Sequence, residues 1–333
     1  MGNSPHPVPP PRAGEGTGGG VLVVGPSWVG DMVMAQSLFM RLKALTPDTA
    51  IDVLAPGWSL PLIARMPQVR RGIEIPLGHG QFGFGVRRRL GLGLSAHGYS
   101  QAIVLPGSWK SALVPFFAGI PRRTGYRGEM RYGLLNDLRH RDGGTTVRQF
   151  VALADAAGEI PQPRLRVDPA EAVRVMGKLG LKPGPAVALM PGAEYGPAKR
   201  WPYFPELSKQ LQTQTLILGS ANDREAAQGI AGRNLVGETS LDEAIALIAG
   251  ADYVVTNDSG LMHVAAALGR PQVALFGSSS PAHTPPLSSA ARVLWLRVEC
   301  SPCFERECPL GHFRCMREMT VETVLQEIQN LAA

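Results

Sequence analysis

A carboxylate stands at the end of a glycine-containing turn early in the chain. The turn 25–30 (GPSWVG) follows the apolar run Val21–Val24, and Asp31 opens a stretch with the apolar spacing of a helix. In a first helical turn this carboxylate would stabilise the helix dipole by about 0.3–2 kcal/mol. At a strand end it can instead act as a general base, and Gly30 leaves room for a substrate beside it. Asp31 is therefore a candidate catalytic base, with a helix-stabilising carboxylate as the alternative.

Two cations lie in a later turn, residues 191–202 (PGAEYGPAKRWP). Lys199 and Arg200 precede Trp201, whose apolar side chain we expect to anchor the turn. Neighbouring Lys and Arg residues on a surface are usually only hydrated, but anchored cations can neutralise a diphosphate leaving group without a metal. Glu194 in the same turn is either a local ion-pair partner or a contact to a sugar.

A third turn connects the apolar run Tyr253–Thr256 to a helix and carries four residues of interest, Asp258, Ser259, Gly260 and His263. Asp258 or Ser259 can cap the helix, and His263 alone is typical of a packed or surface histidine. As a group they also suit a phosphorylated sugar. Ser259 and the first helical N–H groups can bind phosphate oxygens, Gly260 permits close backbone approach, and Asp258 can hold sugar hydroxyls.

All four cysteines of the chain lie close together near its C-terminus, with His312 in their last interval. Their spacing is C-x2-C-x4-C-x6-C, which is not a standard zinc-finger pattern, and they are Cys300, Cys303, Cys308 and Cys315. In a reducing compartment such clustering favours a tetrahedral zinc site over disulfides. The two interpretations are a structural zinc site and reduced thiols without a metal.

These turns belong to a strand and helix alternation that restarts after a proline-containing segment. Strands are expected at 21–24, 51–54, 102–105, 186–190, 215–218, 253–256 and 273–276. The pattern predicts an α/β chain with two doubly wound, Rossmann-like domains facing a central cleft that holds the ligand. We expect domains at 21–165 and 183–318, a linker with a helix at 166–182, and a C-terminal helix at 319–333 that packs back on the first domain.

Three other segments are less regular. Residues 1–20 are rich in proline and glycine and lack the apolar core of a signal peptide, which predicts a disordered tail on a cytoplasmic protein. Residues 65–89 are basic and predicted to be irregular, whereas residues 224–230 are predicted to be helical. No apolar run reaches the roughly 18 residues of a membrane span.

Composition narrows the function classes. A length of 333 residues suits two domains, and a net charge of +6 with a pI of about 9.3 favours an anionic partner. The glycines do not form G-x-G-x-x-G, and no Gly-Lys-Ser/Thr of a P-loop occurs, which disfavours an NAD enzyme or an ATPase. Basic residues are dispersed among glycine and proline with few aromatics, which disfavours nucleic-acid binding.

Three long motifs, taken in order, strongly resemble the heptosyltransferases of glycosyltransferase family 9. They are GPSWVGDMVMAQSL at 25–38, MPGAEYGPAKRWP at 190–202 and TNDSGLMHVAAALGRPQVALFGSSSPAHTPPLS at 256–288. The resemblance runs from about Val21 to the C-terminal helix. It implies a GT-B architecture with an N-terminal acceptor domain and a C-terminal nucleotide-sugar domain. It also implies inverting, metal-independent transfer of L-glycero-D-manno-heptose from ADP-heptose to the first heptose of the lipopolysaccharide inner core.

The resemblance also implies roles for individual residues. The catalytic aspartate of the family matches Asp31, and its donor-phosphate lysine matches Lys199. Its D-[ST]-G-x-x-H element, with the aspartate on the heptose and the next two residues on the phosphates, matches Asp258, Ser259, Gly260 and His263. Asp31 would deprotonate the acceptor 3-hydroxyl, which attacks the anomeric carbon opposite the departing ADP. Lys199 and the helix after Ser259 would stabilise the charge that grows on the diphosphate.

The expected partners are ADP-heptose, the lipopolysaccharide core on Kdo-lipid A and the anionic cytoplasmic surface of the inner membrane, with no nucleic acid and no required cofactor. Acceptor-side candidates in the first domain are Trp28, Lys110, Arg122, Arg123 and Arg127. The sequence departs from the related first-heptose transferases at one turn. They carry a glutamate that contacts the nucleotide, whereas this chain has SAND at 220–223.

Three alternatives remain open at this point. A paralogue could add the first or a later heptose. A nucleotide-binding redox or sensor protein could use the same doubly wound halves, although the missing G-x-G-x-x-G opposes it. A non-catalytic nucleic-acid binder is suggested only by the pI.

Overall fold

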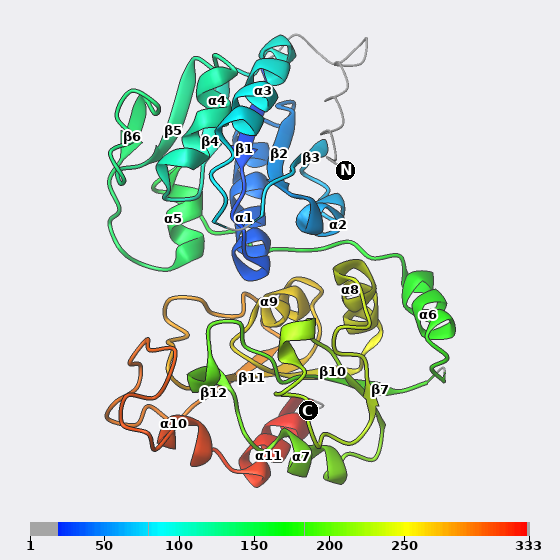
Figure 1. The fold of residues 1–333 in the computed structure, drawn as a ribbon. Coiled ribbons are helices and arrows are strands. Elements are labelled where there is room, and N and C mark those ends of the chain that lie inside the picture. The colour runs from blue at the N-terminus through cyan, green and yellow to red at the C-terminus, as the bar shows by residue number, and fades with distance from the viewer. Residues whose placement is uncertain (1–18, 79, 183, 332–333) are drawn as a thin grey trace. The chain divides into compact units, whose positions relative to one another are not determined.

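The structure is a computed structural model that describes residues 19–78, 80–182 and 184–331. The predicted tail at 1–20 therefore lies outside the described residues except for its last two positions. The chain divides into two compact units, Met1–Pro161 and Gln162–Ala333. Each unit is an α/β fold built on one six-stranded parallel sheet (Figure 1). The prediction of two doubly wound α/β domains is confirmed.

The sheet of the first unit has the strand order β3-β2-β1-β4-β5-β6. Its strands are β1 (Val21–Val24), β2 (Ile51–Pro56), β3 (Arg71–Ile75), β4 (Gln101–Val104), β5 (Arg122–Tyr126) and β6 (Asp137–Arg139). Its helices are α1 (Val29–Leu45), α2 (Leu60–Ala64), α3 (Phe84–Leu94), α4 (Leu113–Phe117) and α5 (Thr146–Ala152). Helix α1 packs with α5 and α3 packs with α4. The central strand β1 is apolar and buried throughout, as a strand covered on both faces must be.

The second unit repeats this order, because its sheet runs β12-β11-β10-β7-β8-β9. Its strands are β7 (Ala186–Met190), β8 (Gln214–Ile217), β9 (Arg233–Asn234), β10 (Tyr253–Asn257), β11 (Gln272–Phe276) and β12 (Ala291–Trp295). Its helices are α6 (Pro169–Lys178), α7 (Phe204–Gln210), α8 (Leu241–Gly250), α9 (Gly260–Ala267), α10 (Arg314–Arg317) and α11 (Val321–Leu331). Helices α8 and α9 cover one face of the sheet and α7 and α11 the other (Figure 1).

In both units the strand order reverses between the first and fourth strands, β1 and β4 or β7 and β10. The carboxyl ends of the two strands at this switch point leave a crevice, because their following helices go to opposite faces. Asp31 lies in the first turn of α1, directly after β1, and Lys199 lies in the connection after β7. Lys110 and Asp258 follow β4 and β10. The fold therefore places the candidate turns of each unit at the position where doubly wound sheets bind ligands.

Two predicted segments differ from the structure. Residues 65–89 were expected to be irregular, but they contain β3 and the start of α3. Strand β3 lies at a sheet edge and exposes two of its five residues, so its charged side chains are compatible with pairing. Residues 224–230 were expected to be helical, but they form turns after a short 3₁₀ segment. Helical spacing over seven residues is too short to hold a helix without tertiary packing.

The C-terminal helix has a different place from the one predicted. We expected it to pack back on the first domain, but α11 packs against β11, β12 and α7 of the second unit. Val321 and Val324 belong to the core cluster of that unit, together with Trp201 and Phe204. Helix α6, in the segment predicted as a linker, packs on α8 of the same unit. Both helices thus pack within the second unit.

Candidate active site

The centre of the candidate site in the second unit is an ion pair between Lys199 and Asp258. Lys199 Nζ lies 2.5 Å from Asp258 Oδ2, although 59 residues separate them in sequence. The Asp258 side chain is only 5% exposed and the Lys199 side chain 15% exposed. Ser279, in the turn after β11, donates its hydroxyl to the same carboxylate oxygen at 2.5 Å. Three neighbouring strand ends thus supply the cation, the carboxylate and the hydroxyl.

The turn that carries Lys199 is fixed at both of its ends by Asn257, the last residue of β10. The Asn257 side chain donates to Pro191 O at 2.7 Å and accepts from Trp201 N–H at 3.1 Å. Trp201 is buried as predicted and packs edge-on against Phe204 at 5.2 Å between ring centroids. A single amide thus holds the whole turn against β10, which carries Asp258.

Tyr195 provides a second contact to the lysine. Lys199 Nζ lies 4.9 Å from the centroid of the Tyr195 ring, and Arg306 lies 5.6 Å from the same ring. Cations over an aromatic face are attracted by its quadrupole. Glu194 is exposed, and its backbone carbonyl accepts from Arg306. The turn therefore gathers two cations at one aromatic ring.

The start of α9 offers backbone N–H groups beside this pair. Ser259 occupies the N-cap position with extended backbone, but its side chain makes no capping hydrogen bond. Its hydroxyl lies 3.4 Å from Thr256 Oγ1. Because Asp258 is engaged by Lys199 and Ser279, neither candidate residue caps α9 through its side chain in this structure. The first-turn N–H groups and Ser259 can therefore serve a phosphate, as the helix dipole favours.

His263 lies one turn inside α9 and is buried, with 5% exposure. Burial lowers its pKa to about 4, against the opposing effect of the Asp258 carboxylate and with a further lowering by the Lys199 charge. The imidazole is therefore neutral at neutral pH and cannot add a positive charge for a diphosphate. This agrees with the interpretation of His263 as a packed histidine.

Asp31 lies in the first turn of α1 in the first unit, where no side chain caps the helix. Burial raises its pKa to about 6. A carboxylate with a pKa in this range is a stronger base than an ordinary aspartate and is still ionised at neutral pH. Trp28, at the N-cap position of the same helix, is 49% exposed. The position of Asp31 suits both interpretations, a general base and a carboxylate that stabilises α1.

The acceptor-side cations differ in how far their charges are already engaged. Arg122 forms an ion pair with Asp137 at 2.9 Å. Arg123 donates to the carbonyls of Leu134, Ile120 and Gly133. Lys110 Nζ donates to Gly80 O at 2.8 Å, and Arg127 is exposed. The structure thus favours a structural role for Arg123, whereas Arg127 has the exposure that a ligand contact needs.

Residues 220–223, where this chain lacks the glutamate of the related transferases, bind the Asp223 carboxylate within their own turn. Ser220 donates both its backbone N–H and its hydroxyl to Asp223 Oδ2, each at 2.8 Å. Asp223 also lies against the start of the lysine turn, since a Cβ on Gly192 would come within 2.2 Å of its Oδ1. Asp223 is therefore a buried support for that turn.

Three residues of this site were not predicted from sequence, namely Tyr195, Asn257 and Ser279. Asn257 directly precedes Asp258, and Ser279 lies in the GSSS turn after the next strand. Asn257 ends β10 and Ser279 follows β11, and these strands are neighbours in the sheet, so a prediction of strand order would have found both residues. Tyr195 carried no sequence signal beyond its place in the lysine turn.

The four cysteines are free thiols, and all of them line one small cavity of the second unit. In the part of the chain that the structure describes, no three His, Cys, Asp or Glu side chains already converge on a metal position. The predicted zinc site stays a prediction. Within the same described residues, none of the helices has the length and apolar character to cross a bilayer.

The chain was compared with protein families and with known proteins. Residues 87–314 match the model of glycosyltransferase family 9 (heptosyltransferase). The chain is 48% identical to lipopolysaccharide heptosyltransferase 2 of Escherichia coli (strain K12), covering 93% of this chain and 98% of the relative. It is 44% identical to lipooligosaccharide heptosyltransferase 2 of Haemophilus influenzae, covering 94% and 99%.

A solved structure gives the same result in three dimensions. The structure of E. coli ADP-heptose lps heptosyltransferase II superposes with a TM-score of 0.83 and 46% identity, covering 94% of this chain and 98% of that one. The similarity therefore extends over both units rather than over one nucleotide-binding half.

Proposed function

This chain belongs to glycosyltransferase family 9, and from that premise we propose that it is a heptosyltransferase II, which transfers heptose from ADP-heptose to the lipopolysaccharide inner core. The observation that carries the proposal is the cluster of Lys199, Asp258 and Ser279 beside the uncapped start of α9. A cation and free N–H groups suit a diphosphate, and a carboxylate suits sugar hydroxyls.

The chemistry divides between the two units. Asp31 takes the proton of the acceptor hydroxyl, and the oxygen forms a bond to the anomeric carbon of the donor. The bond between that carbon and the diphosphate oxygen breaks, which inverts the carbon and releases ADP. The diphosphate competes with Asp258 for Lys199, so binding of the donor frees the carboxylate to accept hydrogen bonds from the heptose. Lys199 and the N–H groups of α9 then stabilise the charge on the leaving group.

An acceptor panel tests the proposal. Purified protein is incubated with ADP-heptose and with Kdo-lipid A acceptors that carry no heptose, one heptose or two heptoses, and ADP release is measured. We expect turnover with the acceptor that carries one heptose. Turnover only with the acceptor that lacks heptose, or only with the longest one, would instead identify a paralogue that adds the first or a later heptose.

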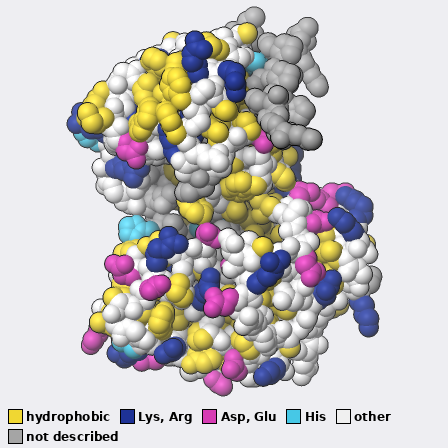
Figure 2. Space-filling view, viewed as in Figure 1, with side chains coloured by type: hydrophobic (Ala, Val, Ile, Leu, Met, Phe, Trp, Pro, Cys, Tyr) yellow, Lys and Arg dark blue, Asp and Glu magenta, His cyan; other side chains and the backbone are white. Residues whose placement is uncertain are grey.

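We further propose that the first unit binds the anionic cytoplasmic surface of the inner membrane, where a lipid-anchored acceptor resides. Five aromatic rings follow one another at centroid distances of 5.1–5.9 Å, and they are Trp109, Phe82, Phe84, Phe117 and Phe116. Four of them are more than 40% exposed. Hydrophobic side chains gather over α3 and α4 with Lys and Arg beside them (Figure 2). Exposed apolar patches with a basic border are typical of membrane contact.

Vesicle sedimentation tests this location. Binding to vesicles of phosphatidylglycerol and phosphatidylethanolamine is compared with binding to phosphatidylcholine vesicles. The variant Arg88→Glu/Arg89→Glu, which reverses two exposed charges of α3, should bind the anionic vesicles at least about tenfold more weakly, since each cation near such a surface contributes about 1 kcal/mol. The variant Arg174→Glu in the second unit serves as the control. Equal binding of all three proteins would contradict the membrane proposal and leave the heptose transfer proposal untouched.

A further inference from the structure

The segment between β12 and α10 contains no helix or strand, although it spans residues 296–313. Connections longer than about 12–15 residues without secondary structure are uncommon in compact domains unless they carry a function or a cross-link. This segment contains Cys300, Cys303 and Cys308, and Cys315 follows in α10. The residues that could cross-link the segment are thus its own cysteines.

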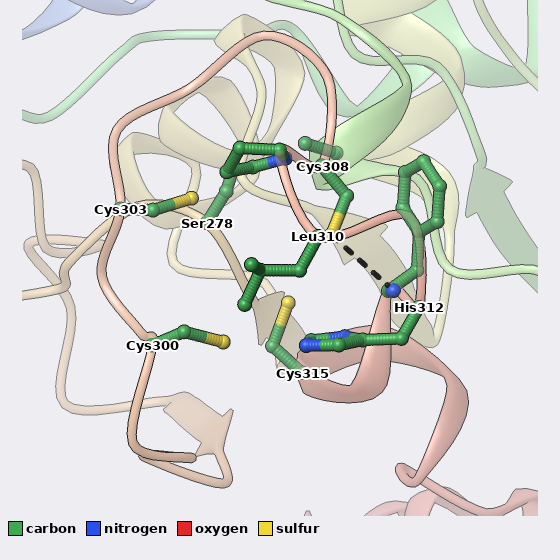
Figure 3. Close-up of a pocket in the computed structure, with 10 residues that line it drawn as sticks. Ser278, Cys300, Cys303, Cys308, Leu310, His312 and Cys315 are labelled. Atoms are coloured by element: carbon green, nitrogen blue, oxygen red, sulfur yellow. Dashed lines mark hydrogen bonds between the residues drawn. The ribbon is translucent and has the colours of Figure 1, made fainter.

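All four cysteines line the same cavity, together with Ala198, Ser278 and His312 (Figure 3). The cavity has a volume of about 20 Å³. A single water-sized body needs roughly 10–15 Å³ by this measure, so the space suits one ion and not a polynuclear cluster. Ser278 is 1% exposed, and its hydroxyl is buried without a hydrogen-bond partner among the described residues. A buried orphaned hydroxyl at the wall of a cavity indicates that something polar belongs there.

The surroundings of Cys308 suit a thiolate. Its sulfur accepts from the backbone N–H of Phe313 at 3.4 Å. An N–H donor at a sulfur stabilises negative charge there, as in thiolate ligands of metals. His312 Nδ1 accepts from Arg314 N–H at 3.1 Å, so this ring nitrogen is occupied. The chemistry of the cavity is therefore that of sulfur ligands.

We propose that Cys300, Cys303, Cys308 and Cys315 bind one divalent transition-metal ion through four thiolates, zinc being the ion that this ligand set favours. The four sulfurs surround the cavity without converging on one point, so binding draws them inward by rotation of the cysteine side chains. Binding displaces the thiol protons to solvent, and attraction to the common cation offsets the repulsion between the four thiolates. It fixes a segment that has no helix or strand of its own.

The metal site supports the turn that carries Lys199. Arg306 O, in the cysteine segment, accepts from Ala198 N–H at 3.1 Å, and Phe304 O accepts from the Tyr195 hydroxyl at 2.5 Å. The two segments approach so closely that a Cβ on Gly196 would lie 2.4 Å from Arg306 O. Metal binding therefore rigidifies the cysteine segment that contacts the turn carrying Lys199. This consequence rests on the proposed function, whereas the metal site itself does not.

Metal content is the direct test. The full chain is purified under reducing conditions without added chelator and analysed for metals and for thiols that react in the native state. We expect about one zinc ion per chain and thiols that become reactive only after chelation. Added cobalt(II) should give the visible absorption of tetrahedral thiolate coordination. One equivalent of iron would support the four-thiolate site and change only the identity of its ion.

Substitutions test the ligand set. Cys303→Ser and Cys308→Ser should lose the metal, whereas His312→Ala and Leu310→Ala, which change non-ligand residues of the same cavity, should retain it. Metal retained by both cysteine variants, or lost from His312→Ala, would overturn the ligand set. A wild-type protein with four reactive thiols and no cobalt uptake would overturn the site, even if every variant failed to fold. Because none of these measurements uses heptose transfer, failure of the proposed function would be seen separately.

Discussion

Lys199 Nζ is held 2.5 Å from Asp258 Oδ2, so the cation expected to meet the donor diphosphate already has a buried carboxylate as its partner. A buried ion pair stabilises a protein little compared with apolar residues, but the loss of one partner leaves an uncompensated charge. The pair is thus better explained by function than by stability, because a diphosphate can take the lysine and leave the carboxylate for a sugar.

This ion pair predicts that stability and activity can be separated by substitution. Lys199→Ala should lower the free energy of unfolding by about 3–5 kcal/mol, because Asp258 then stays buried without its cation. The double variant Lys199→Ala/Asp258→Asn should recover most of that stability and still lack transferase activity. Urea unfolding and the donor kcat/KM measure the two effects.

Arg200, which follows Lys199 in the same turn, provides the control for this stability prediction. Arg200 pairs with Glu225, whose side chain is 82% exposed, at 3.2 Å. Arg200→Ala should therefore cost less than about 1 kcal/mol. If Lys199→Ala were no more destabilising than Arg200→Ala, the pair with Asp258 would not be the buried interaction described above.

The raised pKa of Asp31 predicts a pH dependence. A base must be ionised, so kcat/KM should fall as the pH drops below about 6. Asp31→Asn should lower kcat by about 10²–10⁴-fold and abolish this limb of the profile. Asp48→Asn, at an exposed aspartate of the same unit, is the control and should leave both unchanged.

The same pKa has a consequence for stability. Because burial raises the pKa in the folded state above the ordinary value of 3.8, the folded protein binds the proton more tightly than the unfolded chain. The stability contributed by the protonated carboxyl is complete below pH 3.8 and is lost as the pH rises to about 6. Asp31→Asn should therefore be at least as stable as the wild type at pH 7. A marked loss of stability would indicate that Asp31 mainly stabilises α1.

Ser279 makes a third prediction. Its hydroxyl donates to Asp258 at 2.5 Å, and removal of such a bond to a charged group costs about 1.5–3 kcal/mol. Ser279→Ala should lower stability by this amount. It should also raise the donor KM, because the Asp258 carboxylate loses one of the two side chains that hold it in place. Ser278→Ala removes an equally buried hydroxyl that has no partner among the described residues, and it should leave the donor KM unchanged. Equal donor KM values for the two variants would exclude Ser279 from the donor site.

The sequence predicted the central strands well because they are apolar on both faces. The strands around Val23 and Ala188 are examples, and their following turns held the candidate residues. Strand β5, which lies between β4 and the edge strand β6, begins with Arg122 and Arg123 and was missed, because these charges do not fit the apolar pattern of a buried strand. The roles of the site residues themselves remain predictions.

The contacts within the site could not be read from the sequence. The pairing of Lys199 with Asp258 joins residues 59 positions apart and depends on β10 lying beside β7. Local patterns give strands but not their neighbours, so Lys199 was assigned only to a diphosphate. The engagement of Arg123 by backbone carbonyls was hidden for the same reason, because two of its partners, Gly133 and Leu134, lie in the connection between β5 and β6.

Arg123 and Arg127 therefore predict a separation of stability from ligand binding in the first unit. The guanidinium of Arg123 donates to three carbonyls, so Arg123→Ala should lower the free energy of unfolding by about 2–4 kcal/mol. Arg127 is exposed, and Arg127→Ala should change stability by less than about 0.5 kcal/mol. Of these two variants, only Arg127→Ala should raise the acceptor KM while leaving stability unchanged. If Arg127→Ala left the acceptor KM unchanged while Arg123→Ala raised it without unfolding the protein, the assignment of the two arginines would be reversed.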